Sequence, residues 1–266
     1  MENNKKKYEK NIFKPNKFVA ILIYILFFFI LAALITYLIA GIYSKINNVD
    51  YEQIKASYAL KTADFKNLPI EILKANAITQ GYGNLIIYLL AGSLIIFFTR
   101  DEFKLDLYKI KERKSFYAWF IPTAVILFVL ICYLVDLLFK RIIPSSENQL
   151  QIENILKNGG MLPMIITTLL LAPLVEELIF RKCIFSLCGK NRIVLAYISS
   201  IVLFVLPHML TTSTDFATWI LQAIPYIVAA SLFATIYHLS GFNFYVTLLA
   251  HIANNGLALI LVFTKG

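Results

Sequence analysis

Cysteine, histidine and charged residues are all scarce in this sequence of 266 residues, and these shortages exclude several kinds of protein. The three cysteines, Cys132, Cys183 and Cys188, fit no CxxC or CxxH spacing, so they predict neither a disulfide framework nor a thiolate metal site. Only 15% of the residues are charged, whereas 59% are hydrophobic and the mean hydropathy is +0.71. A soluble protein of this size has no need of so much apolar surface.

The hydrophobic residues gather in runs long enough to cross a bilayer, which takes about 20 residues as a helix. We therefore predict an all-α fold, a polytopic transmembrane helix bundle with seven spans. The segment Ser44–Gly83 is predicted to be a partly helical external loop, and an eighth span would form if part of it inserts. A second loop is predicted at Lys140–Gly160, and it divides an N-terminal transmembrane region, residues 1–160, from a helix core, residues 161–266. The predicted spans are Phe18–Tyr43, Asn84–Thr99, Phe116–Phe139, Met161–Leu187, Arg192–Met209, Thr218–Leu239 and Phe242–Phe263.

The formal charge of +9 does not indicate nucleic-acid binding, because of where the basic residues lie. They gather at Lys5–Lys17, Arg100–Lys114 and Arg181–Arg192, each time beside a hydrophobic run. This pattern is typical of loops kept on the cytoplasmic side, so we predict an integral membrane protein with a cytoplasmic N-terminus. We expect no cleavable signal peptide, because the first run is too long for one. The abundance of Lys, Asn and Ile suggests an AT-rich bacterial genome, and hence a bacterial plasma membrane.

The most unusual stretch is Leu174–Phe185, LVEELIFRKCIF, where two adjacent carboxylates lie inside an apolar run. A charge in hydrocarbon costs roughly 3 kcal/mol or more, so such residues usually mark a functional site. Arg181 follows Glu177 by one helical turn and can neutralise it. Glu176 points about 100° further round the helix, with Phe180 one turn on instead of a cation. Glu176 is therefore the less compensated carboxylate and the better candidate for a general base.

Two histidines lie in later spans, each paired at a spacing of four residues that places both members on one helix face. His208 follows Phe204 at this spacing, and Asn255 follows His251. A carboxylate and an imidazole can activate water, and an imidazole and a carboxamide can stabilise an oxyanion. Alternatively, Glu176, His208 and His251 could bind zinc, whose bound water would then be the nucleophile.

Other signatures are absent. The sequence has neither the HExxH of common metalloproteases nor the GxSxG of serine hydrolases. It shows no internal repeat, so a proton-coupled transporter built from inverted repeats gains no support. A non-catalytic membrane interaction or immunity protein that keeps the motifs stays open as the main alternative to an enzyme.

Three motifs follow one another in successive predicted membrane helices: Glu-Glu-x-x-x-Arg at 176–181, Phe-x-x-x-His at 204–208 and His-x-x-x-Asn at 251–255. In this order they resemble the CPBP family, which comprises the type II CAAX prenyl endopeptidases and the bacteriocin-processing (Abi) intramembrane proteases. The resemblance covers roughly Met161–Phe263 and implies that residues 161–266 form the catalytic core of an intramembrane endopeptidase. The implied partners are the lipid bilayer and a membrane-associated peptide or protein substrate, prenylated or not.

The resemblance implies site roles for six residues: Glu176, Glu177, Arg181, His208, His251 and Asn255. Glu176 would activate water with the help of His208. His251 and Asn255 would form the oxyanion site, and the other two residues would support the first motif. Family members are commonly labelled metalloproteases, whereas a metal-independent glutamate mechanism has been argued for the type II CAAX branch, so a divalent metal such as zinc stays open.

We expect these groups to converge in one polar cavity that opens toward the cytoplasm. Three polar residues are left outside the site: Asp136 is expected at the external interface, His238 fits no motif, and Asn254 is expected to pack or to donate a hydrogen bond. The aromatic residues near the ends of the spans are predicted to form an interfacial belt that includes Tyr117, Trp119 and Trp219.

Overall fold

A computed structural model of the chain describes residues 14–139, 142–143, 145–188, 190–210 and 215–264. Most of the N-terminal segment predicted to be cytoplasmic, Met1–Lys17, lies outside this range, as does Gly189 in the turn that follows the fourth predicted span. The described residues form helices and turns and contain no β-strand, which confirms the all-α prediction.

Six helices of the described chain are long and apolar enough to cross a membrane, and they confirm a polytopic helical bundle. A further apolar helix, α10 (Ile193–Met209), has 17 residues and corresponds to the fifth predicted span. Between residues 48 and 69 the chain forms only the short helices α4 (Tyr51–Ser57) and η2 (Thr62–Asn67), so this segment contributes no eighth span. The six long helices are Asn16–Asn47, Ile70–Glu112, Lys114–Phe139, Met161–Phe185, Phe216–Leu239 and Phe244–Thr264.

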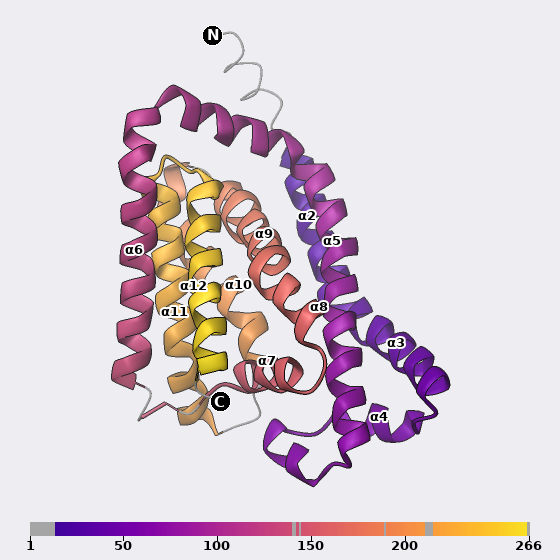
Figure 1. Ribbon diagram of the computed structural model, residues 1–266. Coiled ribbons are helices and arrows are strands. Elements are labelled where there is room, and N and C mark those ends of the chain that lie inside the picture. The colour runs from indigo at the N-terminus through magenta and orange to yellow at the C-terminus, as the bar shows by residue number, and fades with distance from the viewer. Residues whose placement is uncertain (1–13, 140–141, 144, 189, 211–214, 265–266) are drawn as a thin grey trace.

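The first span comprises α2 (Lys14–Ile25), the π-helical segment η1 (Leu26–Leu31) and α3 (Ala32–Asn47). The next helix, α5 (Ile70–Glu112), has 43 residues and is much longer than the predicted span at Asn84–Thr99. The segment Ser44–Gly83 is partly helical, as predicted: it contains α4, η2 and the first turns of α5. The loop predicted after the span was wrong, because α5 continues through most of the basic segment 100–115. Figure 1 shows the last part of α5 crossing the end of the bundle before α6 (Lys114–Phe139) returns.

A central helix connects the two ends of the bundle and carries the carboxylate pair (Figure 1). It contacts α2, α5, α10 and α12 (Phe244–Thr264), so it is enclosed by the other spans. Two of its segments have π-helical geometry, and all nine residues of the second are buried. Insertions of π-helix are rare in proteins, and those that occur often lie at functional sites. The segments of the central helix are α8 (Met161–Ile166), η3 (Thr167–Leu171), α9 (Ala172–Glu176) and η4 (Glu177–Phe185).

A short helix, α7 (Glu147–Lys157), occupies most of the loop predicted at Lys140–Gly160, so that prediction was wrong for its second half. The helix forms because Ser146 caps it: its hydroxyl oxygen accepts a hydrogen bond from the amide of Gln149 over 3.3 Å. A tight turn then brings the chain against α5, where a Cβ atom added to Gly160 would lie 2.5 Å from a backbone oxygen. The turn therefore needs glycine at this position. Residues 140, 141 and 144 of the predicted loop lie outside the described chain.

A buried cluster of charges joins three helices at the end of the bundle where α5 crosses. Lys182 Nζ of the central helix lies 3.2 Å from Glu102 Oε2 and 2.7 Å from Asp106 Oδ2, both on α5. Lys17 of α2 lies 2.8 Å from Glu102, and Lys109 lies 2.9 Å from Asp106. The cluster fixes the end of the central helix against α2 and α5. We call this end of the bundle the basic end.

The predicted aromatic belt is wrong for Tyr117. This residue is buried, and its hydroxyl group donates a hydrogen bond over 2.7 Å to the backbone oxygen of Ser240, which ties α6 to the turn between α11 (Phe216–Leu239) and α12. Trp219 is partly buried and donates to the backbone oxygen of Met209. Trp119 is 80% exposed, as a residue at the bilayer surface would be.

Candidate active site

The two adjacent carboxylates lie where α9 meets η4, and both are buried. Glu177 Oε2 lies 3.3 Å from Arg181 Nε, which confirms the predicted ion pair within the helix. The Arg181 guanidinium also lies over the rings of Phe204 and Phe233, 4.9 and 5.1 Å from their centroids. A cation desolvated in this way is stabilised by the negative faces of the rings. Glu177 is thus compensated by Arg181, and Glu176 is left facing the other helices.

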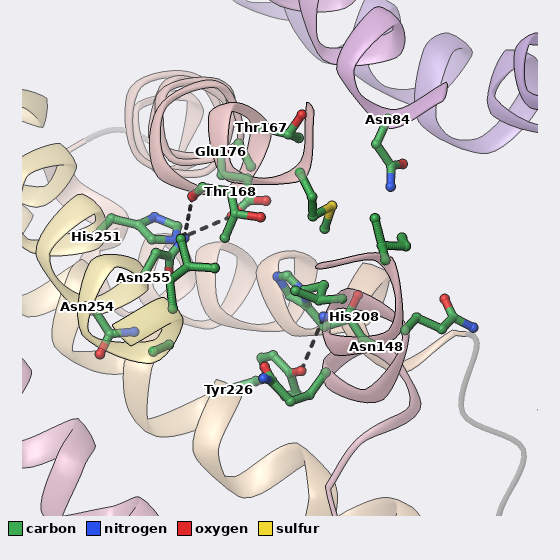
Figure 2. Close-up of a pocket in the computed structure, with 18 of the residues that line it drawn as sticks. Asn84, Asn148, Thr167, Thr168, Glu176, His208, Tyr226, His251, Asn254 and Asn255 are labelled. Atoms are coloured by element: carbon green, nitrogen blue, oxygen red, sulfur yellow. Dashed lines mark hydrogen bonds and ion pairs between the residues drawn. The ribbon is translucent and has the colours of Figure 1, made fainter. Parts of the chain in front are cut away.

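His251 of α12 lies between the two carboxylates. Its Nδ1 is 3.1 Å from Glu177 Oε1. Its Nε2 is 3.7 Å from Glu176 Oε2 (Figure 2). An ionised carboxylate can only accept hydrogen bonds, so Nδ1 carries the proton that bonds to Glu177. This bond and the ring of Phe233, 4.6 Å away between centroids, fix the orientation of the imidazole and direct Nε2 toward Glu176.

Tyr88 of α5 is a member of the site that the sequence interpretation missed. Its hydroxyl group donates a hydrogen bond to Glu176 Oε1 over 3.2 Å, and its ring packs edge-on against Phe28. A signal was present in the sequence, because a tyrosine in the middle of an apolar span needs a partner for its hydroxyl group. Instead, only tyrosines near span ends were considered, as parts of an interfacial belt.

His208 lies across the cavity from Glu176, at the end of α10 (Figure 2). Its ring stacks on Tyr226 with 4.8 Å between centroids and an angle of 9° between planes. The hydroxyl group of Tyr226 is 2.8 Å from Ser146 Oγ and accepts a longer hydrogen bond from Asn148 Nδ2, at 3.4 Å. The position of His208 is therefore linked through Tyr226 to α7 and its cap, which the sequence interpretation had assigned to a loop.

Asn255, one turn after His251, reaches the π-helical segment of the central helix. Its Nδ2 donates a hydrogen bond over 2.9 Å to the backbone oxygen of Thr168 (Figure 2). A carboxamide nitrogen has two N–H groups, so this bond leaves one for a ligand. The neighbouring Asn254, which was left outside the predicted site, also lines the cavity.

The predicted convergence is confirmed for four of the six residues. Glu176, His208, His251 and Asn255 all line one cavity of about 310 Å³. Glu177 and Arg181 lie behind its wall, in contact with His251 and Phe204. Further polar residues that line the cavity carry carboxamides, and all of them were missed or left outside the site: Gln80, Asn84, Asn148, Gln149, Gln151 and Asn254.

The donors predicted for zinc do not form a metal site in this arrangement. Within the described part of the chain, no three His, Cys, Asp or Glu side chains are grouped closely enough to bind one metal ion. Glu176 and His251 face each other, but His208 stacks on Tyr226 from the opposite wall. Zinc binding stays a prediction from the sequence.

The other residues left out of the predicted site lie elsewhere. His238 is exposed, and its Nδ1 is 3.1 Å from the hydroxyl group of Tyr197 near the basic end. Asp136 is exposed near the other end of α6. The three cysteines, Cys132, Cys183 and Cys188, are free in the structure.

The fold and this site define an integral membrane protein whose core is a buried set of carboxylate, imidazole and carboxamide groups. Residues 158–257 match the family model of the type II CAAX prenyl endopeptidase Rce1-like proteins. The match contains all three motifs, so the resemblance predicted from them is confirmed over this region.

The chain is also similar to a curated protein. The UPF0177 protein YvdC of Lactococcus lactis subsp. lactis (strain IL1403) is 30% identical over 159 residues, which are 56% of this chain. The aligned region spans 57% of that relative, little more than half of its length. No solved structure matches the chain.

Proposed function

We propose that this protein is an intramembrane endopeptidase that hydrolyses a peptide bond in a membrane-associated peptide or protein. The observation that carries the proposal is the position of Glu176: a buried carboxylate that lines the cavity while its neighbour Glu177 is paired with Arg181. A carboxylate that costs so much to bury is usually retained for its chemistry. The Rce1-like match to residues 158–257 supports the same reaction class.

Glu176 acts as the general base in this mechanism. Its carboxylate accepts a proton from a water molecule as the water oxygen attacks the carbonyl carbon of the substrate, and it then returns a proton to the leaving amine. The hydrogen bond from Tyr88 keeps the carboxylate in one orientation. His208, on the opposite wall, orients the water from its other side.

The oxyanion that forms on the carbonyl oxygen needs hydrogen-bond donors. The free N–H of the Asn255 carboxamide supplies one of them. His251 supplies a second when its Nε2 carries a proton, while its Nδ1–H stays hydrogen-bonded to Glu177. Removing a single donor of this type costs roughly 10²–10³ in kcat in other hydrolases.

The test compares the peptides released from bacterial membranes that contain the wild type or Glu176→Gln, by mass spectrometry at matched expression. A product present only with the wild type supports the endopeptidase and identifies its substrate at once. Glu71→Gln is the matched control, because Glu71 is an exposed carboxylate at the start of α5 and its variant should release the wild-type product. If Glu176→Gln releases the same peptides as the wild type, the proposal is wrong.

A further inference from the structure

The charge distribution distinguishes the two ends of the bundle. Within the described chain, eleven Lys and Arg residues lie at the basic end, against four Asp and Glu residues. The other end has six lysines against eight acidic residues. An excess of Lys and Arg marks the cytoplasmic side of a membrane protein. The basic end therefore faces the cytoplasm. Its eleven basic residues are Lys14, Lys17, Arg100, Lys104, Lys109, Lys111, Arg113, Lys114, Lys182, Lys190 and Arg192.

The cavity lies toward the other end. Its deep wall is formed by buried side chains such as those of Phe233 and His251, whereas the α7 residues that line it, among them Gln149 and Gln151, are partly exposed. The helix α7 packs against α8, the first turn of the central helix, and the basic cluster lies at the last turn of that helix. Figure 1 accordingly shows α7 at the end of the bundle opposite the corner between α5 and α6.

The C-terminal helix, α12, also shows that the cavity lies toward the end opposite the basic end. The last turns of α12 pack on α7, since Ile155, Leu156, Leu259 and Val262 form one buried cluster. The first residues of α12 lie at the basic end, where the backbone amide of Phe244 donates a hydrogen bond to Asp106 over 2.8 Å. One helix thus connects the basic end with the mouth of the cavity.

The chemistry of the mouth suits a peptide main chain. Seven carboxamide side chains line the cavity, and each of them carries both donors and an acceptor, as a peptide bond does. Glu176 is the only Asp, Glu, Lys or Arg side chain among the described residues that line the cavity. The mouth can therefore form hydrogen bonds with an extended, uncharged segment without requiring an opposite charge on it.

We propose that the cavity receives its substrate from the extracytoplasmic face of the membrane, as an uncharged peptide segment displayed on the outer surface. This inference rests on the proposed endopeptidase function. It differs from the sequence-based expectation that the cavity opens toward the cytoplasm. The cavity lies toward the end of the bundle opposite the basic end, and the excess of basic residues assigns the basic end to the cytoplasmic side.

The test is the accessibility of single cysteines to a membrane-impermeant maleimide in intact bacteria. Cys132, Cys183 and Cys188 are first replaced by alanine, and Gln151→Cys or Lys111→Cys is then introduced, the first at the mouth of the cavity and the second on the exposed basic corner. We expect Gln151→Cys to react in intact cells and Lys111→Cys to react only after permeabilisation. The reverse pattern would overturn the proposal.

A second measurement serves if the cysteine-free protein fails to fold. Alkaline phosphatase, which is active only outside the cytoplasm, is fused to the C-terminus of the unmodified chain, since α12 ends beside α7. An active fusion supports access from outside, and an inactive fusion on a stably inserted protein contradicts it. Neither readout depends on proteolysis, so a failure of the endopeptidase proposal would be recognised separately.

Discussion

The hydroxyl group of Tyr88 donates a hydrogen bond to Glu176 Oε1 over 3.2 Å, although 88 residues separate them in sequence. This contact makes α5 part of the site, whereas the family match begins only at residue 158. A segment outside the three motifs therefore orients the carboxylate on which the proposed chemistry depends.

Replacing Tyr88 by phenylalanine should lower kcat about tenfold and change KM little, because a hydrogen bond to a charged group contributes about 1.5 kcal/mol. Tyr82→Phe, on the same helix but exposed, should keep wild-type kinetics. Steady-state rates on a substrate found by the membrane comparison give both constants. An unchanged kcat in Tyr88→Phe would show that Glu176 needs no such support.

The ion pair behind the cavity should be tested by a double-mutant cycle. Arg181→Met leaves Glu177 buried without its cation, so we expect a loss of about 3–5 kcal/mol in the free energy of unfolding. Adding Glu177→Gln removes the uncompensated charge and should recover part of that loss. Unfolding by SDS in mixed micelles measures all four proteins. If the two single losses simply add, the pair is not coupled.

The charge cluster at the basic end should matter for stability without contributing to the chemistry. Lys182→Met leaves Glu102 with Lys17 alone and Asp106 with Lys109 alone, so we expect a loss of about 3 kcal/mol, at the lower end for a broken buried pair. Lys104→Met, on the exposed side of α5, should change stability by less than about 0.5 kcal/mol. Equal stability of the two variants would mean that the cluster stabilises nothing.

Removal of divalent metal ions should leave the proposed activity intact, because the predicted ligands do not gather around one point. Dialysis against EDTA and then 1,10-phenanthroline, followed by the cleavage assay, measures this directly. Loss of activity that zinc restores would show that the side chains rearrange around a metal, and would favour the zinc alternative raised by the sequence.

The spans and the first-motif ion pair could be predicted because local physics determines them. Apolar runs of sufficient length indicate membrane helices, and a spacing of four residues places Arg181 beside Glu177. The extent of α5 could not be predicted in this way. Its polar ends are helical because they pack on the bundle, where Asp106 and Lys182 compensate each other's burial across two helices. Tertiary contacts of this kind leave no periodic signal in the sequence.

The candidate site, like the fold, could be predicted only where local sequence patterns determine it. The three motifs identified the residues that supply charge and hydrogen-bond donors, and four of them meet in one cavity. Tyr88, Tyr226 and the carboxamides of α7 come from segments with no motif, and their roles depend on which helices become neighbours. The tyrosines also have an ordinary alternative role at membrane interfaces, which concealed these two.

The most direct measurement is hydrolysis by purified protein in proteoliposomes, in water enriched in ¹⁸O, with mass spectrometry of the products. The wild type and Glu71→Gln should yield the same product with one solvent oxygen in its new carboxyl group. Glu176→Gln, at equal stability to SDS, should yield none. Cleavage by Glu176→Gln at the wild-type rate would contradict the assignment of Glu176 as the residue that activates water.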